Sequence, residues 1–359
     1  LGDVYKRQGA GGTYDGDGTK WDYRRVSFFG RVNYNYNDRY LIQATVRSDG
    51  SSKFGADNRW GVFPSIAVGW RICEEEFFPK GIALNNLKLR ASWGRLGNEN
   101  ALGYYDFLAL ISTYNTKYQG YVKGNGDNAW AGSIARGLEN RSLKWETTDT
   151  KNIGLDFGFF NNKLTGAMNY YYNQTEELLI TKALPPSAGL NNPILNVGKI
   201  RNSGVEVEIN WADSKGGFDY NIGMNFSTTK NKVVELADKG QVLYGEGLKY
   251  GTEHFPTQTR VGKPIGAFYL YKTNGLFQSN EEARQYVNAD GDEYQPFADA
   301  GDIRFVDVNG DGSIDDDDKV YCGSGIPTLE VNLNFSAGYK GFDLSVVLGS
   351  AWGCLLYTS

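Results

Sequence analysis

Histidine and cysteine are scarce in this chain, with one His and three Cys among 359 residues. Cys73, Cys322 and Cys354 have no metal-ligand spacing, and an odd number of cysteines excludes a complete disulfide framework. His254 has no nucleophile motif near it, so nothing indicates that it acts as a catalytic base. A nucleophile elbow, a phosphate loop and a zinc motif are also absent. These absences predict that the chain is not an enzyme.

Long hydrophobic runs and excess positive charge are missing as well. No run of about 18 apolar residues occurs, so no membrane-spanning helix is expected. The net charge is −5 with a pI near 5.2. Proteins that bind nucleic acid usually carry an excess of basic residues, which this chain lacks, so we expect no nucleic-acid partner.

The chain is rich in extended stretches that alternate apolar and polar residues. Aromatic residues make up 14% of the chain, and many stand near the ends of these stretches. Successive side chains of a strand point to opposite faces, so each stretch predicts a strand with one apolar and one polar face. Ten such strands are expected, and the clearest apolar sets are Val26, Phe28, Val32 and Tyr34; Leu87, Leu89, Ala91 and Trp93; Ile153, Leu155, Phe157 and Phe159; and Val205, Val207, Ile209 and Trp211.

The connections distinguish a membrane barrel from a soluble β-sandwich, which would show the same alternation. Tight turns follow every second strand, at 37–38, 161–162, 214–217 and 339–341. Long loops follow the others, at roughly 48–60, 96–142, 176–200 and 230–327. Only the connection at 72–86 does not fit this pattern well, because it falls on the side of the short turns but is long. Short turns at one rim and long loops at the other are typical of outer-membrane barrels, so we predict an all-β, transmembrane, antiparallel β-barrel.

Residues 307–318, DVNGDGSIDDDD, have the spacing of a calcium loop. Calcium takes six to eight oxygen ligands, and a tight loop with Gly at its sixth position turns alternate side-chain oxygens inward. The candidate ligands are Asp307, Asn309, Asp311, Ser313, Asp315 and Asp318. Position 12 is Asp and no flanking EF-hand helices are expected, so a solvated acidic turn is the alternative.

The two ends break the strand pattern abruptly. Residues 1–8 and 354–359 resemble translated adapter sequence, and we expect them to be foreign to the protein. The barrel region is then 9–353, with 230–327 as a long extracellular loop region. On this interpretation the chain is an internal piece of a longer protein.

Several long motifs resemble the SusC/RagA family of TonB-linked outer-membrane proteins of Bacteroidetes. They are LKLRASWGRLGNEN (87–100), VGKIRNSGVEVEINW (197–211), VGKPIGAFYLYKTNGLFQS (261–279) and GDIRFVDVNGDGSIDDDDK (301–319), together with 29–71 and 143–179. The resemblance implies a plugged barrel of about 22 strands, so this chain would be an incomplete half-barrel. It also implies active import of glycans or peptides, powered by TonB–ExbB–ExbD under a SusD-like lipoprotein lid. The plug and the TonB box would lie outside this chain.

The resemblance assigns roles to two sets of residues. Polar residues such as Arg47, Lys88, Arg90, Glu206 and Glu208 would line the hydrated lumen, while the apolar faces would meet outer-membrane lipid. Aromatic loop residues are candidates for sugar stacking or lid contact because their rings suit both: Tyr104, Tyr105, Tyr114, Tyr118, Tyr121 and Trp130. Bound calcium would be structural. A passive porin or surface adhesin, and a soluble β-rich carbohydrate-active enzyme, remain the alternatives.

Overall fold

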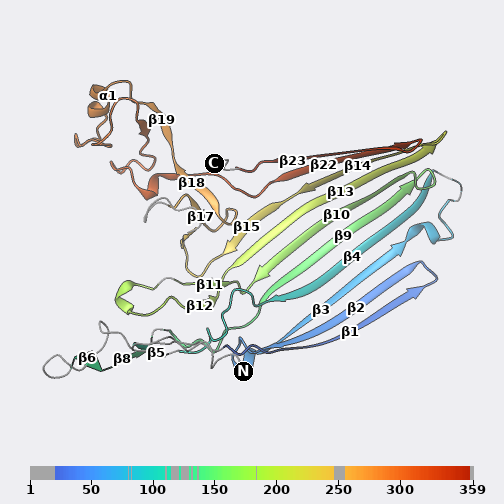
Figure 1. The fold of residues 1–359 in the computed structure, drawn as a ribbon, viewed down its shortest axis with the longest axis horizontal. Coiled ribbons are helices and arrows are strands. Elements are labelled where there is room, and N and C mark those ends of the chain that lie inside the picture. Colours follow the sequence, from blue (N-terminus) through green and yellow to red (C-terminus); the bar gives the residue numbers. More distant parts are fainter. Residues whose placement is uncertain are drawn as a thin grey trace, which may run out of the picture.

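The computed structural model describes residues 21–355, apart from 80, 82, 110, 115–120, 123–128, 131, 136, 183 and 246–254. Ten long strands form one antiparallel sheet in the order β1-β2-β3-β4-β9-β10-β13-β14-β22-β23, and β15 also pairs with β13 (Figure 1). The long strands are β1 (Arg25–Tyr36), β2 (Tyr40–Ser51), β3 (Trp60–Arg71), β4 (Leu84–Asn98), β9 (Glu146–Phe159), β10 (Leu164–Glu176), β13 (Lys199–Lys215), β14 (Phe218–Thr228), β22 (Leu329–Tyr339) and β23 (Phe342–Trp352). The predicted ten-strand antiparallel wall is confirmed. The sheet is open, with β1 and β23 at its edges.

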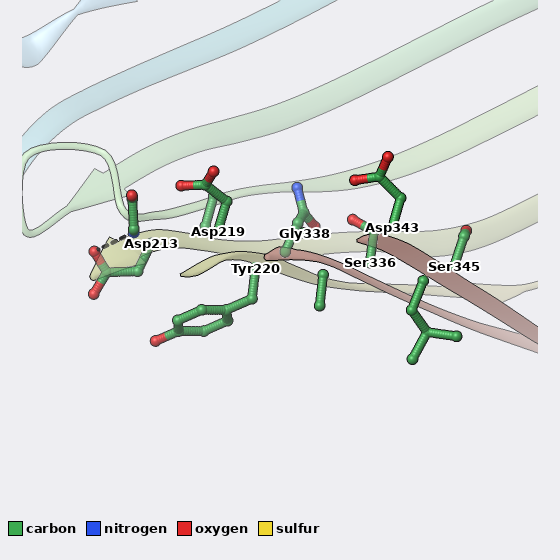
Figure 2. A pocket seen from close by; sticks show the side chains of 12 residues that line it. Asp213, Asp219, Tyr220, Ser336, Gly338, Asp343 and Ser345 are labelled. Carbon is green, nitrogen blue, oxygen red and sulfur yellow. Dashed lines mark hydrogen bonds between the residues drawn. The ribbon is translucent and has the colours of Figure 1, made fainter. Parts of the chain in front are cut away.

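The two faces of this sheet differ as the alternation predicts. On one face Ile153, Met168 and Tyr170 are 60%, 46% and 50% exposed, although they are large and apolar. The other face carries the charged and amide side chains. Figure 2 shows this near the turns of β14 and β23, where Asp219 and Asp343 extend to one side and Tyr220 to the other. We call these surfaces the apolar face and the polar face.

The connections are sorted between the two ends of the sheet. Figure 1 shows the short turns at one end and the long loops, with their own small elements, at the other. Three of the short turns have two central residues with positive φ, as type I′ hairpins require: Asn37 and Asp38, Gly216 and Gly217, and Lys340 and Gly341. Two strands run further into the long loops than expected, with β2 ending at Ser51 and β4 at Asn98, whereas β9 begins at Glu146, after the expected end of its loop at 142.

The connection from β3 to β4 is longer than the other turns at its end, and Glu75 anchors it. One Glu75 carboxylate oxygen accepts hydrogen bonds from the Tyr40 hydroxyl at 2.6 Å and the Trp70 indole N–H at 2.9 Å. Arg39 lies 3.5 Å from the other oxygen. These contacts explain how a longer segment remains folded against the short-turn rim.

The remaining secondary structure lies in the long loops, apart from one 3-10 helix in the β3–β4 connection. The short strands are β5 (Ile111–Tyr114), β6 (Tyr121–Val122), β7 (Ala129–Trp130), β8 (Gly132–Ala135), β11 (Leu179–Thr181), β12 (Ile194–Asn196), β15 (Lys230–Glu235), β16 (Leu243–Tyr244), β17 (Thr257–Thr259), β18 (Ala267–Tyr271), β19 (Thr273–Leu276), β20 (Ile303–Phe305) and β21 (Lys319–Gly323). Among the described residues, the α-helix is α1 (Asn280–Gln285), and 3-10 helices cover Ala56–Asn58, Ile72–Glu74, Pro186–Ala188 and Asp316–Asp318. No helix in the described ranges is long and apolar enough to cross a membrane.

The buried apolar clusters lie at the loop end of the sheet and within the loops. The largest packs the side chains of Phe54, Phe63, Leu102, Leu143 and Trp145 together, and smaller clusters form around Val233 and Phe277. Residues buried in these clusters come from different loops and strand ends. Packing therefore holds the outer loops to the wall, while most of the apolar face remains exposed.

Candidate functional site

An exposed aromatic cluster lies at the loop end of the sheet. Trp21 and Tyr23 precede β1, and Tyr104 belongs to the loop that follows β4. The Tyr104 ring centroid is 6.2 Å from that of Trp21 and 6.1 Å from that of Tyr23. The three residues remain 64%, 43% and 40% exposed in the order Trp21, Tyr23, Tyr104. Flat rings in this arrangement present apolar surface with polar edges to solvent.

Lys53 fixes the position of this cluster. Its Nζ donates hydrogen bonds to the backbone oxygens of Leu102, at 2.7 Å, and Glu99, at 3.4 Å. The same ammonium lies 5.8 Å from the ring centroids of both Tyr23 and Tyr104, within the range of a cation–π interaction. Lys53 therefore links the loop after β4 to the segment before β1.

Glu99 lies behind the cluster and is 4% exposed. Its Oε1 accepts a hydrogen bond from the Tyr23 hydroxyl at 2.7 Å, and Arg25 lies 3.6 Å away. Burial raises the pKa of Tyr23, and the neighbouring carboxylate raises it further. Glu99 Oε2 is buried and has no hydrogen-bond partner among the described residues. Because buried polar atoms are normally paired, this oxygen is an acceptor open to a ligand donor or to water.

The polar face beneath the cluster is segregated by charge. Arg90 forms a forked ion pair with Asp156, with its closest contact at 2.6 Å, and Arg47 pairs with Asp49 at 2.7 Å. Basic residues predominate on this face of β1 to β4. The opposite part of the wall carries carboxylates instead: Glu206, Glu208, Asp219, Glu330 and Asp343.

A hollow of about 720 Å³ lies at the short-turn end of β13, β14, β22 and β23. Asp213, Asp219 and Asp343 are among its lining residues, and Figure 2 shows them with Ser336 and Ser345. Asp213 is paired with Lys163 at 2.7 Å. This hollow is at the opposite end of the wall from the aromatic cluster.

The aromatic residues singled out from the sequence have different surroundings. Tyr104 belongs to the aromatic cluster, and the Tyr105 hydroxyl accepts a hydrogen bond from the backbone N–H of Asp22 at 3.0 Å. Tyr121 in β6 is register-paired with Trp130 in β7, and Tyr114 in β5 is paired with Gly132. Tyr118 lies outside the described residues, as does His254. Trp21, Tyr23 and Lys53 were missed, although the aromatic pair standing just before the first strand was a usable signal.

The calcium-like loop is closed by its own carboxylates. Asp307 accepts backbone N–H groups from Gly310 at 2.6 Å and Gly312 at 2.9 Å. The fully buried Asp318 accepts the N–H groups of Val308 at 2.7 Å and Asp315 at 2.9 Å. Gly312 has a φ of +90°, the conformation for which glycine is preferred at the sixth position.

The remaining candidate ligands lie along the same closed loop. Asp311 Oδ1 accepts the Ser313 N–H at 2.9 Å, Asn309 Oδ1 accepts the Asp311 N–H at 2.8 Å, and Asp315 caps the short 3-10 helix that ends at Asp318. Within the described ranges, no group of three or more His, Cys, Asp or Glu side chains is placed to hold a metal ion. The loop backbone fits the motif, and its carboxylates are engaged with N–H donors.

The electrostatics of this loop follow from those hydrogen bonds. Burial acts to raise the pKa of Asp307, but the N–H groups of Gly312 and Gly310 outweigh it and hold the pKa below its ordinary value. Nearby, burial and the Asp316 carboxylate raise the pKa of Tyr271 to about 12. Asp307 is therefore ionised and Tyr271 is protonated at neutral pH.

We expect acid to loosen this loop. Because the pKa of Asp307 is lower in the folded than in the unfolded chain, its stabilising contribution is complete only well above the unfolded value of about 3.9. It is lost as the pH falls from about 5 through the lower, folded pKa. Hydrogen exchange of peptides covering 303–321 in the full-length protein, corrected for intrinsic rates, should show less protection at pH 3.5 than at pH 6. Equal protection in Asp307→Asn and the unsubstituted protein at pH 6 would contradict this.

Comparison with known proteins agrees with this architecture. Residues 2–349 match the family described as TonB dependent receptor-like, beta-barrel. TonB-dependent receptor P3 of Formosa agariphila is 32% identical over 329 residues, covering 91% of this chain and 32% of that protein. TonB-dependent receptor SusC of Bacteroides thetaiotaomicron is 33% identical over 338 residues, covering 92% of this chain and 31% of that protein.

The solved structure of the RagAB peptide transporter has the same fold. It superposes with a TM-score of 0.73 at 24% identity, covering 92% of this chain and 34% of that one. The chain spans about a third of the length of the curated relatives it matches. The polar face is accordingly the lumenal face, and the apolar face is the lipid-facing one. The chain belongs to the TonB dependent receptor-like β-barrel family of outer-membrane proteins, and its ten-stranded sheet is part of such a barrel wall.

Proposed function

We propose that this chain supplies part of the wall and outer mouth of a transporter that imports nutrient oligomers, with glycans favoured over peptides. The exposed cluster of Trp21, Tyr23 and Tyr104 at the loop end carries this proposal. Aromatic faces suit the C–H surfaces of sugar rings, and Glu99 provides a buried acceptor behind them. The likeness to SusC and to the RagAB peptide transporter supports the same class of function.

The wall residues suggest how an oligomer would pass. Substrate would be held on the aromatic cluster beneath a SusD-like lipoprotein, then move along the hydrated lumenal face. Arg90 and Asp156 satisfy each other on that face, so they offer a polar but charge-balanced surface. Energy coupling to TonB–ExbB–ExbD would reside in the other parts of the receptor. We assign no catalytic step to this chain.

Uptake by cells carrying the complete receptor tests this proposal. The double substitution Trp21→Ala and Tyr104→Ala should lower uptake of a labelled oligosaccharide, measured below saturation, by about thirtyfold, because stacking is worth roughly 1 kcal/mol per ring. Phe297→Ala is the matched control, since Phe297 is a 94% exposed aromatic residue elsewhere in the outer loops. Unchanged uptake in the double variant would refute the role of the cluster. Loss of labelled oligopeptide uptake alone would identify peptides as the substrate.

A passive porin or adhesin makes a different prediction in the same cells. Uptake by a porin should persist when the proton-motive force is collapsed or TonB is deleted, and an adhesin should give no uptake. Uptake by an active importer requires both the proton-motive force and TonB. Uptake that survives TonB deletion would therefore reject the importer.

We also propose that calcium orders the loop 307–318. The donor set is chemically suitable, because carboxylate and amide oxygens are the ligands that calcium prefers. Calcium would share oxygens now engaged by backbone N–H groups, so binding should rigidify the loop further. Added calcium should reduce hydrogen exchange of 303–321 in the complete receptor, and Asp311→Asn should weaken this response. An exchange pattern unaffected by millimolar calcium would contradict the proposal.

A further inference from the structure

The lipid-facing side of the wall carries unpaired cations at its loop end. Lys151 on β9 is register-paired with Tyr172 on β10, Tyr172 with Ser203 on β13, and Ser203 with Lys230 on β15. At a spacing of about 4.8 Å between strands, this row spans about 14 Å. Side chains at paired positions share a face, so all four lie on the same face as Ile153 and Tyr170.

A second row of basic residues on the same face lies two residues further along the strands, toward the long loops. Arg201 on β13 is register-paired with Lys232 on β15. Its guanidinium carbon lies 5.2 Å from the Tyr172 ring centroid, and Lys151 Nζ lies 5.8 Å from the same centroid. One tyrosine ring is thus shared by two cations. We call Lys151, Arg201, Lys230 and Lys232 the outer basic patch.

The cations of the outer basic patch are not held in ion pairs within the described part of the chain. None of its four members forms an ion pair with a described residue, and the buried Arg201 Nε has no hydrogen-bond partner there. Two carboxylates on this face pair with other cations, Asp149 with Arg95 at 2.8 Å and Glu176 with Lys199 at 2.9 Å, and Glu235 is register-paired with Lys199. Lys151 and Arg201, which lie beside the Tyr172 ring without ion-pair partners in the described structure, can therefore bind an anion from outside the chain.

A hollow adjoins the patch. Its volume is about 560 Å³, and its lining includes Lys230, Lys232 and Lys263 but no Asp or Glu. Lys263 Nζ lies 4.4 Å from the Tyr321 ring centroid. The hollow therefore continues the basic surface from the wall onto the outer loop region and offers room for a headgroup.

The height of the patch matches the edge of the membrane. Tyr172 lies about 26 Å along β10 from Leu164 at ~3.3 Å per residue, which a strand tilt of about 40° reduces to a rise of about 20 Å. The apolar band of such barrels is about 25 Å tall. Side chains at Tyr172 and beyond consequently lie at the boundary with the outer leaflet, where Lys and Arg can reach headgroups.

We propose that the outer basic patch binds the phosphate of a phosphorylated lipid headgroup in the outer leaflet. Charge complementarity and continuity with the apolar, lipid-facing surface below it favour a lipid over a soluble partner. Tyr172 would hold Lys151 and Arg201 at the spacing that receives the phosphate. Lys230 and Lys232 would complete the contact from the neighbouring strand.

Binding of lipid by the complete receptor in nanodiscs tests this inference. Lys151→Gln, Arg201→Gln and Lys230→Gln together should weaken binding of a phosphorylated lipid A at least tenfold, whereas Lys151→Arg with Lys230→Arg should retain it. Lys340→Gln is the matched control, because Lys340 also lies over a tyrosine ring but at the short-turn end. Retained heat-modifiable migration in gels establishes that each variant is folded.

Three results would overturn the lipid assignment. The first is equal binding of lipid A and its dephosphorylated form. The second is full competition by millimolar inorganic phosphate, which would identify a site for a free anion. The third is unchanged lipid binding with loss of the lipoprotein partner in the triple glutamine variant, which would identify the patch as a protein interface.

Discussion

Gly204→Ala should prevent the complete receptor from forming a folded barrel. Gly204 lies in β13, on the lumenal face, at the point where its neighbour changes from β14 to β15. A Cβ added there would collide with the backbone carbonyl oxygen of Thr228. The Tyr171 hydroxyl occupies the same space and donates to that oxygen at 3.1 Å. Because backbone cannot move aside as a side-chain tip can, we expect a cost at the upper end of overpacking, about 3 kcal/mol or more.

Heat-modifiable migration and the yield of receptor in outer-membrane fractions measure this effect. Gly30→Ala provides the control, since a Cβ at Gly30 in β1 has nothing within 4 Å. Both substitutions replace glycine in a strand with the same side chain, so propensity effects cancel. Normal assembly of Gly204→Ala would show that the wall does not have this close approach.

Asp318→Ala should unfold the calcium-like loop without affecting the wall. The Asp318 side chain is fully buried, and it accepts N–H groups from Val308, Asn309 and Asp315. Removing it leaves three donors without a partner, at about 1 to 3 kcal/mol for each buried group that water does not reach. The expected result is a loss of hydrogen-exchange protection over 303–321 of several kcal/mol.

Two comparisons define this effect. Asp317→Asn alters an exposed neighbour whose backbone N–H merely donates to Asp315, so it should leave protection unchanged. Peptides from β10 should exchange alike in all variants, because β10 makes its contacts with β9 and β13. Protection that falls equally in Asp317→Asn and Asp318→Ala would show that charge density, and not the buried carboxylate, holds the loop.

The wall could be predicted from the sequence because the patterns that specify its strands and turns lie in consecutive residues. Residues such as Ile153 and Met168 repeat with the period of two that a lipid-facing strand requires, and the two-residue turns carry Asn, Asp and Gly where positive φ is needed. Strand ends were less predictable. β2 extends to Ser51 and β9 begins only at Glu146, on either side of the packed pair of Phe54 and Trp145, a contact that sequence spacing does not reveal.

The aromatic cluster could be predicted only in part, because it also depends on contacts between residues that are distant in the sequence. Tyr104 was singled out as an aromatic loop residue, but its partners Trp21 and Lys53 lie 83 and 51 residues away along the chain. Only the folded wall, which places the start of β1 beside the end of β4, brings them together. The calcium motif is local, so the sequence located the loop, but not the network of N–H groups around Asp318. Calcium binding itself stays a prediction.

Spin labels placed one by one along β10, from Leu164 to Tyr172, in the complete receptor in lipid bilayers test the central claim most directly. Native cysteines, Cys73 and Cys322 among them, must first be replaced. Labels at even-numbered positions, which share the face of Met168 and Tyr170, should be relaxed by dissolved oxygen as lipid-exposed sites are. Labels at odd-numbered positions, which share the face of Asn169, should instead be relaxed by a water-soluble nickel reagent or remain shielded from oxygen. Loss of this period of two, or oxygen access at the odd positions, would contradict a barrel wall with its apolar face in the membrane.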